Sequence, residues 1–430
     1  MKGPPSIRPS EGVKQVRYEI RGRLARRAHE LERQGYEIVS LNIGNPRAFG
    51  LRTPETMRLA MIENLAEGEG YCHQKGIFPA REAVVMQQQE RGITGVTAEE
   101  VFIGNGVSEL IDLTLRALLN EGDEVLVPSP DYPLWTAAVT LNRGRAVHYA
   151  CRPQNGFVPD PEEVASLVTP RTRAMVVINP NNPTGAVYPR PVLEALAQLA
   201  ERRALVVFSD EIYDQMTYDG AQFVPMATLV HDTLCATLSG LSKVYRACGY
   251  RVGWAVFSGR THTAADYLHA LELLASLRLC SNVLGQWAVQ TALGGHQSVR
   301  ELVAPGGRLH DSRATILAAV QHSRFLTLAP PAGAMYAFVG VNSAVLPDFD
   351  DQKFALDLLE QKHVLVAPGA SFNVPYCNHF RITNLPDAAT LREVFARIEE
   401  LLADYAAVER HGTPREVLTR NIPSVASRSR

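Results

Sequence analysis

The stretch RAMVVINPNNPTG, residues 173–185, decides the fold class of this chain. Its first half is an unbroken apolar run rich in β-branched residues, which is typical of a strand buried on both faces in a parallel sheet. Its second half holds two prolines and a glycine, which force a turn and place the amide of Asn182 at the strand tip. The stretch therefore predicts a buried strand that ends in a polar side chain.

Comparable apolar runs lie on both sides of this strand, between about residues 100 and 257, and alternate with helical patterns such as VSELIDLTLRALL and LEALAQLAERR. The expected strands are EEVFIG, DEVLVP, AVHYA, ALVVFSD, TLCATLS and VGWAVFS. This alternation predicts an α/β domain whose mostly parallel sheet is covered by helices on both faces. Ligands of such sheets bind beyond the carboxyl ends of the strands, so chemistry is expected there.

The pattern changes after about residue 310. Candidate strands at MYAFVGV, HVLVAP and HFRIT and a closing helix at REVFARIEELLADYAAV predict a smaller α+β domain. The segment before about residue 50 has too little apolar surface to fold alone, so we expect it to pack against that domain. The expected division is an N-terminal arm at 1–14, a small domain at 15–50 and 311–410, a large cofactor-binding domain at 51–310, and a mobile tail at 411–430.

Composition excludes several classes of function. The 430 residues carry a formal net charge of −2, which gives no general electrostatic reason to bind nucleic acid or an anionic membrane. No apolar run approaches the roughly 18 residues of a membrane span, and the first residues lack the apolar core of a secretion signal. The six cysteines are scattered without metal-ligand spacing, which fits reduced thiols in a cytoplasmic protein that binds small molecules and no metal.

Polar groups gather after three neighbouring strands. Besides Asn182, the run ALVVFS leads into Asp210 and Tyr213, and TLCATLS leads into Lys243 and Arg251. Each residue alone has an ordinary explanation as a turn cap, a helix cap or a solvated cation. Together they match the needs of a pyridine aldehyde phosphate, because the aldehyde requires an amine, the ring nitrogen a carboxylate, and the phosphate cations and amides.

A candidate phosphate site precedes them in the chain. The turn GNGVSE, residues 104–109, comes directly before a helix, so free backbone N–H groups at Gly106 and Val107 and the hydroxyl of Ser108 can face an anion. Tyr132, in DYPLW, follows another strand and can stack on a planar ring. A helix cap and a core tyrosine are the ordinary alternatives.

These motifs resemble those of the class I, fold type I pyridoxal phosphate-dependent aminotransferases, from about Tyr18 to Ala406. NPNNPTG, DEIYD and LSKVYRACGYRVGW occur in the family's order and approximate spacing. Phrases such as LNIGNP, GYCHQKG and PDYPLWTAAV are most similar to the bacterial glutamate–pyruvate (alanine) group. The resemblance implies the fold type I architecture and an enzyme of amino-acid metabolism.

The resemblance implies a role for each cofactor-binding position. Lys243 is expected to bind pyridoxal 5′-phosphate covalently as a Schiff base, and Asp210 to pair with the pyridine nitrogen. The ring and phosphate are expected to be held by Tyr132, Asn182, Tyr213, Gly106, Val107, Ser108, Ser242 and Arg251. Tyr71, in GYCHQKG, is expected to reach the phosphate from a second subunit, which implies a homodimer with shared active sites. Gly240 stands where many relatives carry a serine, which puts one phosphate contact in doubt.

The resemblance also places the substrate. Arg381, in HFRIT, is expected to bind the substrate α-carboxylate in bidentate fashion, with help from Asn182 and the backbone of Gly44. The residue that reads a distal carboxylate stays open among Tyr18, Arg21 and Arg278.

The implied reaction is exchange of an amino group between an L-amino acid and a 2-oxo acid by a ping-pong mechanism, with alanine and 2-oxoglutarate favoured. An aspartate, aromatic, branched-chain or specialised amino donor is the alternative, and so is a non-transaminating pyridoxal enzyme on the same fold. A regulatory protein of this fold would carry a DNA-binding region, for which the sequence shows no pattern.

Overall fold

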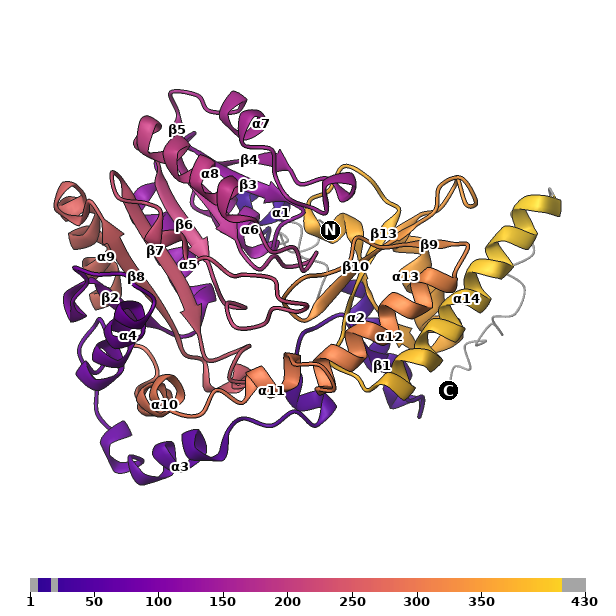
Figure 1. Ribbon diagram of the computed structural model, residues 1–430, viewed down its shortest axis with the longest axis horizontal. Helices are drawn as coiled ribbons and strands as arrows, with labels where there is room; N and C mark the ends of the chain where they lie inside the picture. The colour runs from indigo at the N-terminus through magenta and orange to yellow at the C-terminus, as the bar shows by residue number, and fades with distance from the viewer. Residues whose placement is uncertain (1–6, 17–21, 412–430) are drawn as a thin grey trace, which may run out of the picture.

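The computed structural model describes residues 7–16 and 22–411. A seven-stranded sheet forms the larger part, with strand order β2-β8-β7-β6-β5-β3-β4 (Figure 1). The strands are β2 (Val101–Gly104), β3 (Glu124–Ser129), β4 (Arg145–Ala150), β5 (Thr172–Ile178), β6 (Val206–Asp210), β7 (Leu234–Gly240) and β8 (Gly253–Gly259). β8 runs antiparallel to both of its neighbours, and the other pairs are parallel. The expected mostly parallel sheet is thereby confirmed.

The continuous apolar runs are explained by burial of both faces of this sheet. Val125 and Val127 point into a core formed with α5 (Val107–Leu118), α6 (Leu134–Leu141) and α9 (Ala265–Leu277). Leu126, which alternates with them, points into the opposite core with α4 (Phe78–Glu90), α8 (Arg190–Arg203) and α10 (Val283–Gly294). Full burial of each such side chain contributes about 1.5–3 kcal/mol, which favours apolar residues along the length of each strand.

The smaller part is built on a second sheet of order β12-β13-β10-β9, which lies to the right in Figure 1. Its strands are β9 (Leu326–Thr327), β10 (Tyr336–Val341), β12 (Ala367–Pro368) and β13 (His379–Thr383), and the separate pair β1 (Val39–Ser40) and β11 (Val364–Leu365) is parallel. One apolar core joins this sheet to α2 (Arg23–Arg33), α12 (Arg308–His322), α13 (Asp351–Lys362) and α14 (Ala388–His411). The helical spacing of Leu24, Ala28 and Leu31 gives α2 its buried face.

Several short elements complete the two parts and the connections between them. They include α1 (Glu11–Gln15), α3 (Glu55–Glu63), α7 (Pro161–Ser166), α11 (Val299–Val303) and the 3-10 turns η2 (Pro46–Phe49), η7 (Cys248–Tyr250) and η9 (Gly369–Phe372). Of the expected mobile tail, His411 ends α14, and 412–430 lie outside the described residues, as do 1–6 of the expected arm. No helix in the described ranges is long and apolar enough to cross a membrane.

Two glycines let the sheet approach the turn before α5. A side chain at Gly253 would place its Cβ 2.4 Å from the backbone nitrogen of Val107, and one at Gly240 would lie 2.7 Å from the carbonyl oxygen of Val252. Both distances are far below van der Waals contact with backbone atoms that cannot swing aside. Gly240 and Gly253 are paired across β7 and β8, so this corner of the sheet is packed without side chains.

Gly253→Ala should therefore displace the first turn of α5 and lower the free energy of unfolding by about 1–3 kcal/mol, the usual cost of overpacking. Gly294→Ala is the matched control, because Gly294 ends a helix and a Cβ atom there would meet nothing within 4 Å. The control should be neutral or more stable by up to about 1 kcal/mol. Chemical denaturation of both variants checks this, and equal stabilities would contradict the packing argument.

Candidate active site

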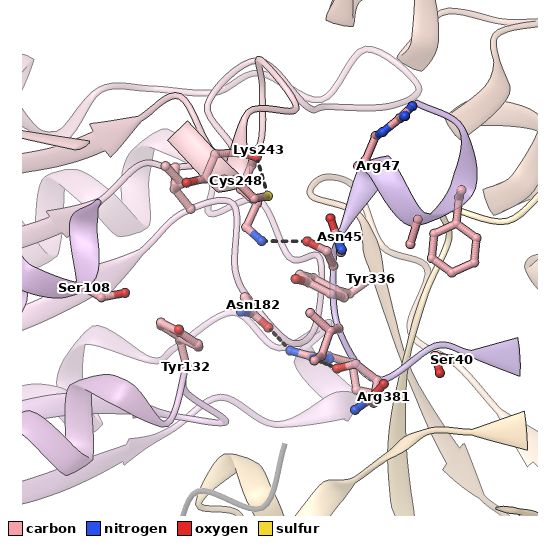
Figure 2. A pocket seen from close by; sticks show the side chains of 18 of the residues that line it. Ser40, Asn45, Arg47, Ser108, Tyr132, Asn182, Lys243, Cys248, Tyr336 and Arg381 are labelled. Atoms are coloured by element: carbon pink, nitrogen blue, oxygen red, sulfur yellow. Dashed lines mark hydrogen bonds between the residues drawn. The ribbon is translucent and has the colours of Figure 1, made fainter. Parts of the chain in front are cut away.

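A cavity of about 1030 Å³ opens between the two parts of the chain, at the carboxyl ends of the parallel strands. Eleven of the residues singled out from the sequence line it: Gly44, Val107, Ser108, Tyr132, Asn182, Asp210, Tyr213, Ser242, Lys243, Arg251 and Arg381. In Figure 2, Ser108 and Tyr132 lie on one side, Tyr336 and Arg381 on the other, and Lys243 and Asn182 between them. The fold thus brings together residues that are up to 337 positions apart in the chain.

The register of the central strands aligns their polar ends. Ile178, Asp210 and Leu238 are direct neighbours on β5, β6 and β7. The loops that follow these strands then carry Asn182 and Lys243 into the cavity. Parallel strands that end in register place their following residues along one edge of the sheet, which is why sequence position predicted the location.

Lys243 extends into this cavity and is only partly buried. Its Nζ atom donates a hydrogen bond to the backbone oxygen of Gly44, 2.8 Å away on the segment that precedes η2. Cys248 lines the same wall, and its Sγ atom contacts the carbonyl oxygen of Ser242 at 2.9 Å. The lysine amine is therefore held toward the cavity by a neutral acceptor.

Asp210 is a carboxylate at the end of an apolar strand, with 4% of its surface exposed. The indole Nε1 of Trp135 donates to Oδ2 at 3.1 Å, and the backbone N–H of Ile212 donates to Oδ1 at 3.4 Å. Burial outweighs these bonds and the attraction of Lys243, and it raises the pKa of Asp210 to about 6. A cation placed against this carboxylate would be strongly favoured.

Arg381 lies on β13 with 2% of its surface exposed. Its Nη1 donates to Oδ1 of Asn182 at 2.8 Å, and its Nη2 donates to the carbonyl oxygen of Asn42. The guanidinium also lies 4.2 Å from the ring centre of Tyr336 and 4.7 Å from that of Phe372. Its buried Nε has no hydrogen-bond partner among the described residues, so the group retains capacity to bind a carboxylate.

The turn before α5 forms the wall near Arg251. Gly106 has φ +82°, and a side chain there would lie 2.5 Å from Nη2 of Arg251. That nitrogen donates to the carbonyl oxygen of Asn105 at 3.1 Å, while Nη1 donates to the carbonyl oxygen of Cys248 at 3.0 Å. The glycine thus lets a guanidinium approach the first turn of a helix, where Ser108 is exposed. A cation and free helix N–H groups together suit an anion.

Sequence reasoning missed Tyr336 and Trp135. Tyr336 lies within the apolar run that becomes β10, and its hydroxyl accepts a hydrogen bond from Tyr213 at 3.2 Å. Burial alone would raise the pKa of Tyr336, but Lys243 and Arg381 lower it. Pairing of β10 with β13 could have located this tyrosine, since it is two residues from the position opposite Arg381. Trp135 follows Tyr132 by one helical turn, a weak signal.

Other sequence-predicted residues lie elsewhere. Arg278 does not line the cavity of this chain, and its guanidinium donates to the carbonyl oxygen of Ile103 at 2.9 Å and pairs with Glu109 at 3.3 Å. Tyr71 is 83% exposed and outside the cavity wall. Tyr18 and Arg21 lie outside the described residues.

The side chains that commonly bind metals are scattered over the fold. Among residues 7–16 and 22–411, no group of three or more histidine, cysteine, aspartate or glutamate side chains could hold a metal ion. The six cysteines are free thiols.

The chain is similar to known proteins over most of its length. The family profile "Aminotransferase class I and II" matches residues 36–398. The glutamate–pyruvate aminotransferase AlaA of Haemophilus influenzae is 46% identical over 396 residues, which cover 92% of this chain and 98% of that protein. A crystal structure of an aminotransferase from Escherichia coli superposes with a TM-score of 0.92 at 44% identity, covering 94% of this chain and 100% of that one. Alanine aminotransferase from Pyrococcus furiosus superposes with a TM-score of 0.87 at 34% identity, covering 92% of this chain and 100% of that one.

The raised pKa of Asp210 predicts a stability effect of known sign. Because the folded-state pKa of about 6 exceeds the ordinary value of 3.8, the folded protein binds more protons than the unfolded chain, and ionisation of Asp210 costs stability as the pH rises through about 4 to 6. In the ligand-free protein at pH 7.5, Asp210→Asn should therefore raise the free energy of unfolding by about 3 kcal/mol. Each unit of the pKa difference corresponds to about 1.36 kcal/mol.

Urea denaturation of parent and variant at pH 5, 6 and 7.5 measures this, and Asp404→Asn on the exposed side of α14 serves as the control. The advantage of Asp210→Asn should grow with pH, while the control shows none. A variant that loses stability relative to the parent as the pH rises would show that the carboxylate already has its counter-charge.

Proposed function

The chain belongs to the class I and II aminotransferase family, and from that membership we propose that it exchanges the amino group between L-alanine and 2-oxoglutarate, with pyridoxal 5′-phosphate as cofactor. The observation that carries this proposal is the convergence of an amine, a buried carboxylate and a buried guanidinium, those of Lys243, Asp210 and Arg381, on one cavity. The names of the relatives favour alanine and glutamate as the amino donors.

The cavity fits the cofactor in its charges and shape. Asp210 is buried with a raised pKa, so a protonated pyridine nitrogen would relieve the cost of ionising it. Gly106 keeps the turn open for Arg251, which suits a phosphate at the start of α5. When bound, the cofactor supplies an electron sink for the substrate Cα.

We assign the holding residues accordingly. Lys243 forms the covalent link, and Tyr132 stacks on the ring. Contacts to the ring hydroxyl and the phosphate come from Asn182, Tyr213, Gly106, Val107, Ser108, Ser242 and Arg251. These assignments are supported by the lining of the cavity and by the position of Gly106 behind it.

Arg381 and Lys243 have different roles in the proposed reaction. Arg381 binds the α-carboxylate of either substrate, because its Nε has no hydrogen-bond partner and its Nη1 is already oriented by Asn182. Lys243, once its amine is free, would act as the base that takes the proton from the substrate Cα and as the acid that later delivers that proton. Since one clamp serves amino acid and 2-oxo acid in turn, the substrates bind one after the other, and ping-pong kinetics follow.

A homodimer with shared active sites is part of the proposal. Large apolar side chains are exposed around α3, η3 (Ala66–Gly68) and α4: Ile62, Leu65, Tyr71, Phe78 and Met86. α10 packs against both α3 and α4, so these elements are close in the fold. Such a patch is typical of a subunit interface, and it supports a contact of Tyr71 with a second subunit's phosphate.

Three further assignments remain proposals. The division into a large domain at 51–310 and a small domain at 15–50 and 311–410 is supported by the core that joins residues 24–41 to 316–406. Tyr18 and Arg21 remain candidates for reading the substrate side chain. The cytoplasmic location rests on the sequence alone.

Purified protein loaded with pyridoxal phosphate should lose its visible lysine-bound absorption on addition of L-alanine, because the amino group passes to the cofactor and the half-reaction stops there. L-Glutamate should do the same, and other amino acids measured in the same way rank the donors. Lys243→Ala should abolish the absorption and the turnover.

Two outcomes would contradict transamination: formation of pyruvate with free ammonia, or consumption of oxygen. A strong response to aspartate or an aromatic amino acid with none to alanine would replace the substrate pair and keep the reaction.

Arg381→Lys should raise KM for both substrates about 10- to 100-fold, since a point charge cannot reproduce a bidentate fork, and a charged hydrogen bond contributes about 1.5–3 kcal/mol. Arg313→Lys is the control, because Arg313 is also buried but contacts Tyr218 and lies outside the cavity. Steady-state kinetics measure both. If the two variants change KM alike, Arg381 does not bind the carboxylate.

A further inference from the structure

One loop of the smaller part lies between the stacking tyrosine and the carboxylate clamp. It comprises η9 and Asn373, and it joins β12 to β13. A side chain at Gly369 would lie 2.6 Å from the carbonyl oxygen of His379, so the loop backbone rests directly on the strand that carries Arg381. A shift of this loop would therefore displace β13.

The other side of the loop is tied to the turn after β3. Asn373 donates its amide to Oδ1 of Asp131 at 2.9 Å and accepts, at its backbone oxygen, a hydrogen bond from Ser129 at 2.8 Å. The backbone N–H of Asp131 donates to the carbonyl oxygen of Phe372 at 3.2 Å. Three hydrogen bonds thus join residues 129–131 of the larger part to residues 372–373 of the smaller part.

Asp131 is a buried carboxyl, with no exposed surface, directly before Tyr132. Its second oxygen accepts a hydrogen bond from the hydroxyl of Thr136 at 2.5 Å, and that hydroxyl also contacts Nε2 of His148 at 2.9 Å. Burial raises the pKa of Asp131 to about 7, although the hydrogen bonds from Thr136 and Asn373 oppose this. A buried carboxyl that costs this much is held in place for a reason beyond packing.

The loop reaches the clamp through one ring. Phe372 is fully buried, and its ring centre lies 4.7 Å from the Arg381 guanidinium. The guanidinium also lies 4.2 Å from the ring centre of Tyr336. Arg381 thus contacts two aromatic rings, and the loop that carries one of them, Phe372, is hydrogen-bonded to Asp131 (Figure 2 shows the Arg381 and Tyr132 ends of this connection).

We propose that Asp131 is a positioning residue that fixes Tyr132 and the Arg381 clamp relative to each other, by holding the loop Phe372–Asn373 against the turn after β3. This inference rests on the proposed function of Arg381. Loss of the Asp131–Asn373 hydrogen bond then frees Phe372 and loosens the substrate-carboxylate site. Asp210 at the end of β6 and Lys243 in the loop after β7 keep their places.

Asn373→Gly tests this with little disturbance of the backbone. Asn373 has φ +55°, which glycine adopts readily, and the carbonyl that accepts from Ser129 remains. KM for the amino acid and for the 2-oxo acid should both rise about 10-fold, as expected for one hydrogen bond to a charged group. The kcat should stay within about 3-fold of the parent, and the visible absorption of the bound cofactor should be unchanged.

Asp131→Asn is the second variant, because it keeps the shape of the side chain but weakens its acceptor, and it should change KM in the same direction. Asn378→Ala is the control: its amide donates to Val341 and Ser343 near the start of β13, away from the cavity. Hydrogen exchange of the ligand-free proteins adds a readout that does not depend on activity. Residues 369–373 and β13 should exchange faster in both test variants and at the parent rate in Asn378→Ala.

Two results would overturn the inference. A lowered melting temperature with unchanged KM would make Asp131 a purely structural residue, and a lowered kcat with unchanged KM would place its effect on the chemistry rather than on carboxylate recognition. Failure of the proposed function is distinguishable, because the parent enzyme would then show no transamination while the exchange comparison would stand.

Discussion

The rest of this structure depends on one constraint, the burial of the Asp210 carboxylate. Asp210 ends an apolar strand, and only 4% of its surface is exposed. Ionised Asp210 receives hydrogen bonds from Trp135 and Ile212, but these do not offset the loss of water, as the raised pKa shows. Such a group persists in a folded protein when a cationic ligand compensates it. The end of β6 is therefore suited to a cationic ligand, and the loops after β5 and β7 bring an amide and an amine, those of Asn182 and Lys243, into the same cavity.

The second organising feature is that the proposed substrate clamp comes from the other part of the chain. Arg381 reaches the cavity from β13 and meets Asn182 from the loop after β5, so the carboxylate recognition that we propose would depend on how the two parts are held together. The loop at residues 372–373 and the turn at 129–131 lie at this junction, where three hydrogen bonds connect them. In the proposed assignment, recognition lies at this junction and the covalent chemistry on the large sheet, so substrate binding and proton transfer would depend on different parts of the fold.

The central sheet and much of the candidate site could be predicted from the sequence, because each strand end is visible there. An apolar run stops, and Asn182, Asp210 or Lys243 follows within a few residues. Register in a parallel sheet then brings these positions to one edge without any further information. Tyr336, Trp135 and Phe372 could not be found in this way, since aromatic residues inside apolar patterns read as core, and whether they also face a cavity depends on pairings over long separations. Arg278 shows a further limit, because its contacts with Ile103 and Glu109, which keep it out of this chain's cavity wall, depend on the fold and have no signature in the sequence.

The central claim is that Lys243 holds the cofactor. Borohydride reduction of the cofactor-loaded protein makes the link permanent, and peptide mapping by mass spectrometry then identifies the modified lysine. We expect the pyridoxyl group on the peptide that contains Lys243 and on no other. Modification of Lys75, which is buried and paired with Glu99 and Glu272, or of no lysine at all, would contradict the assignment.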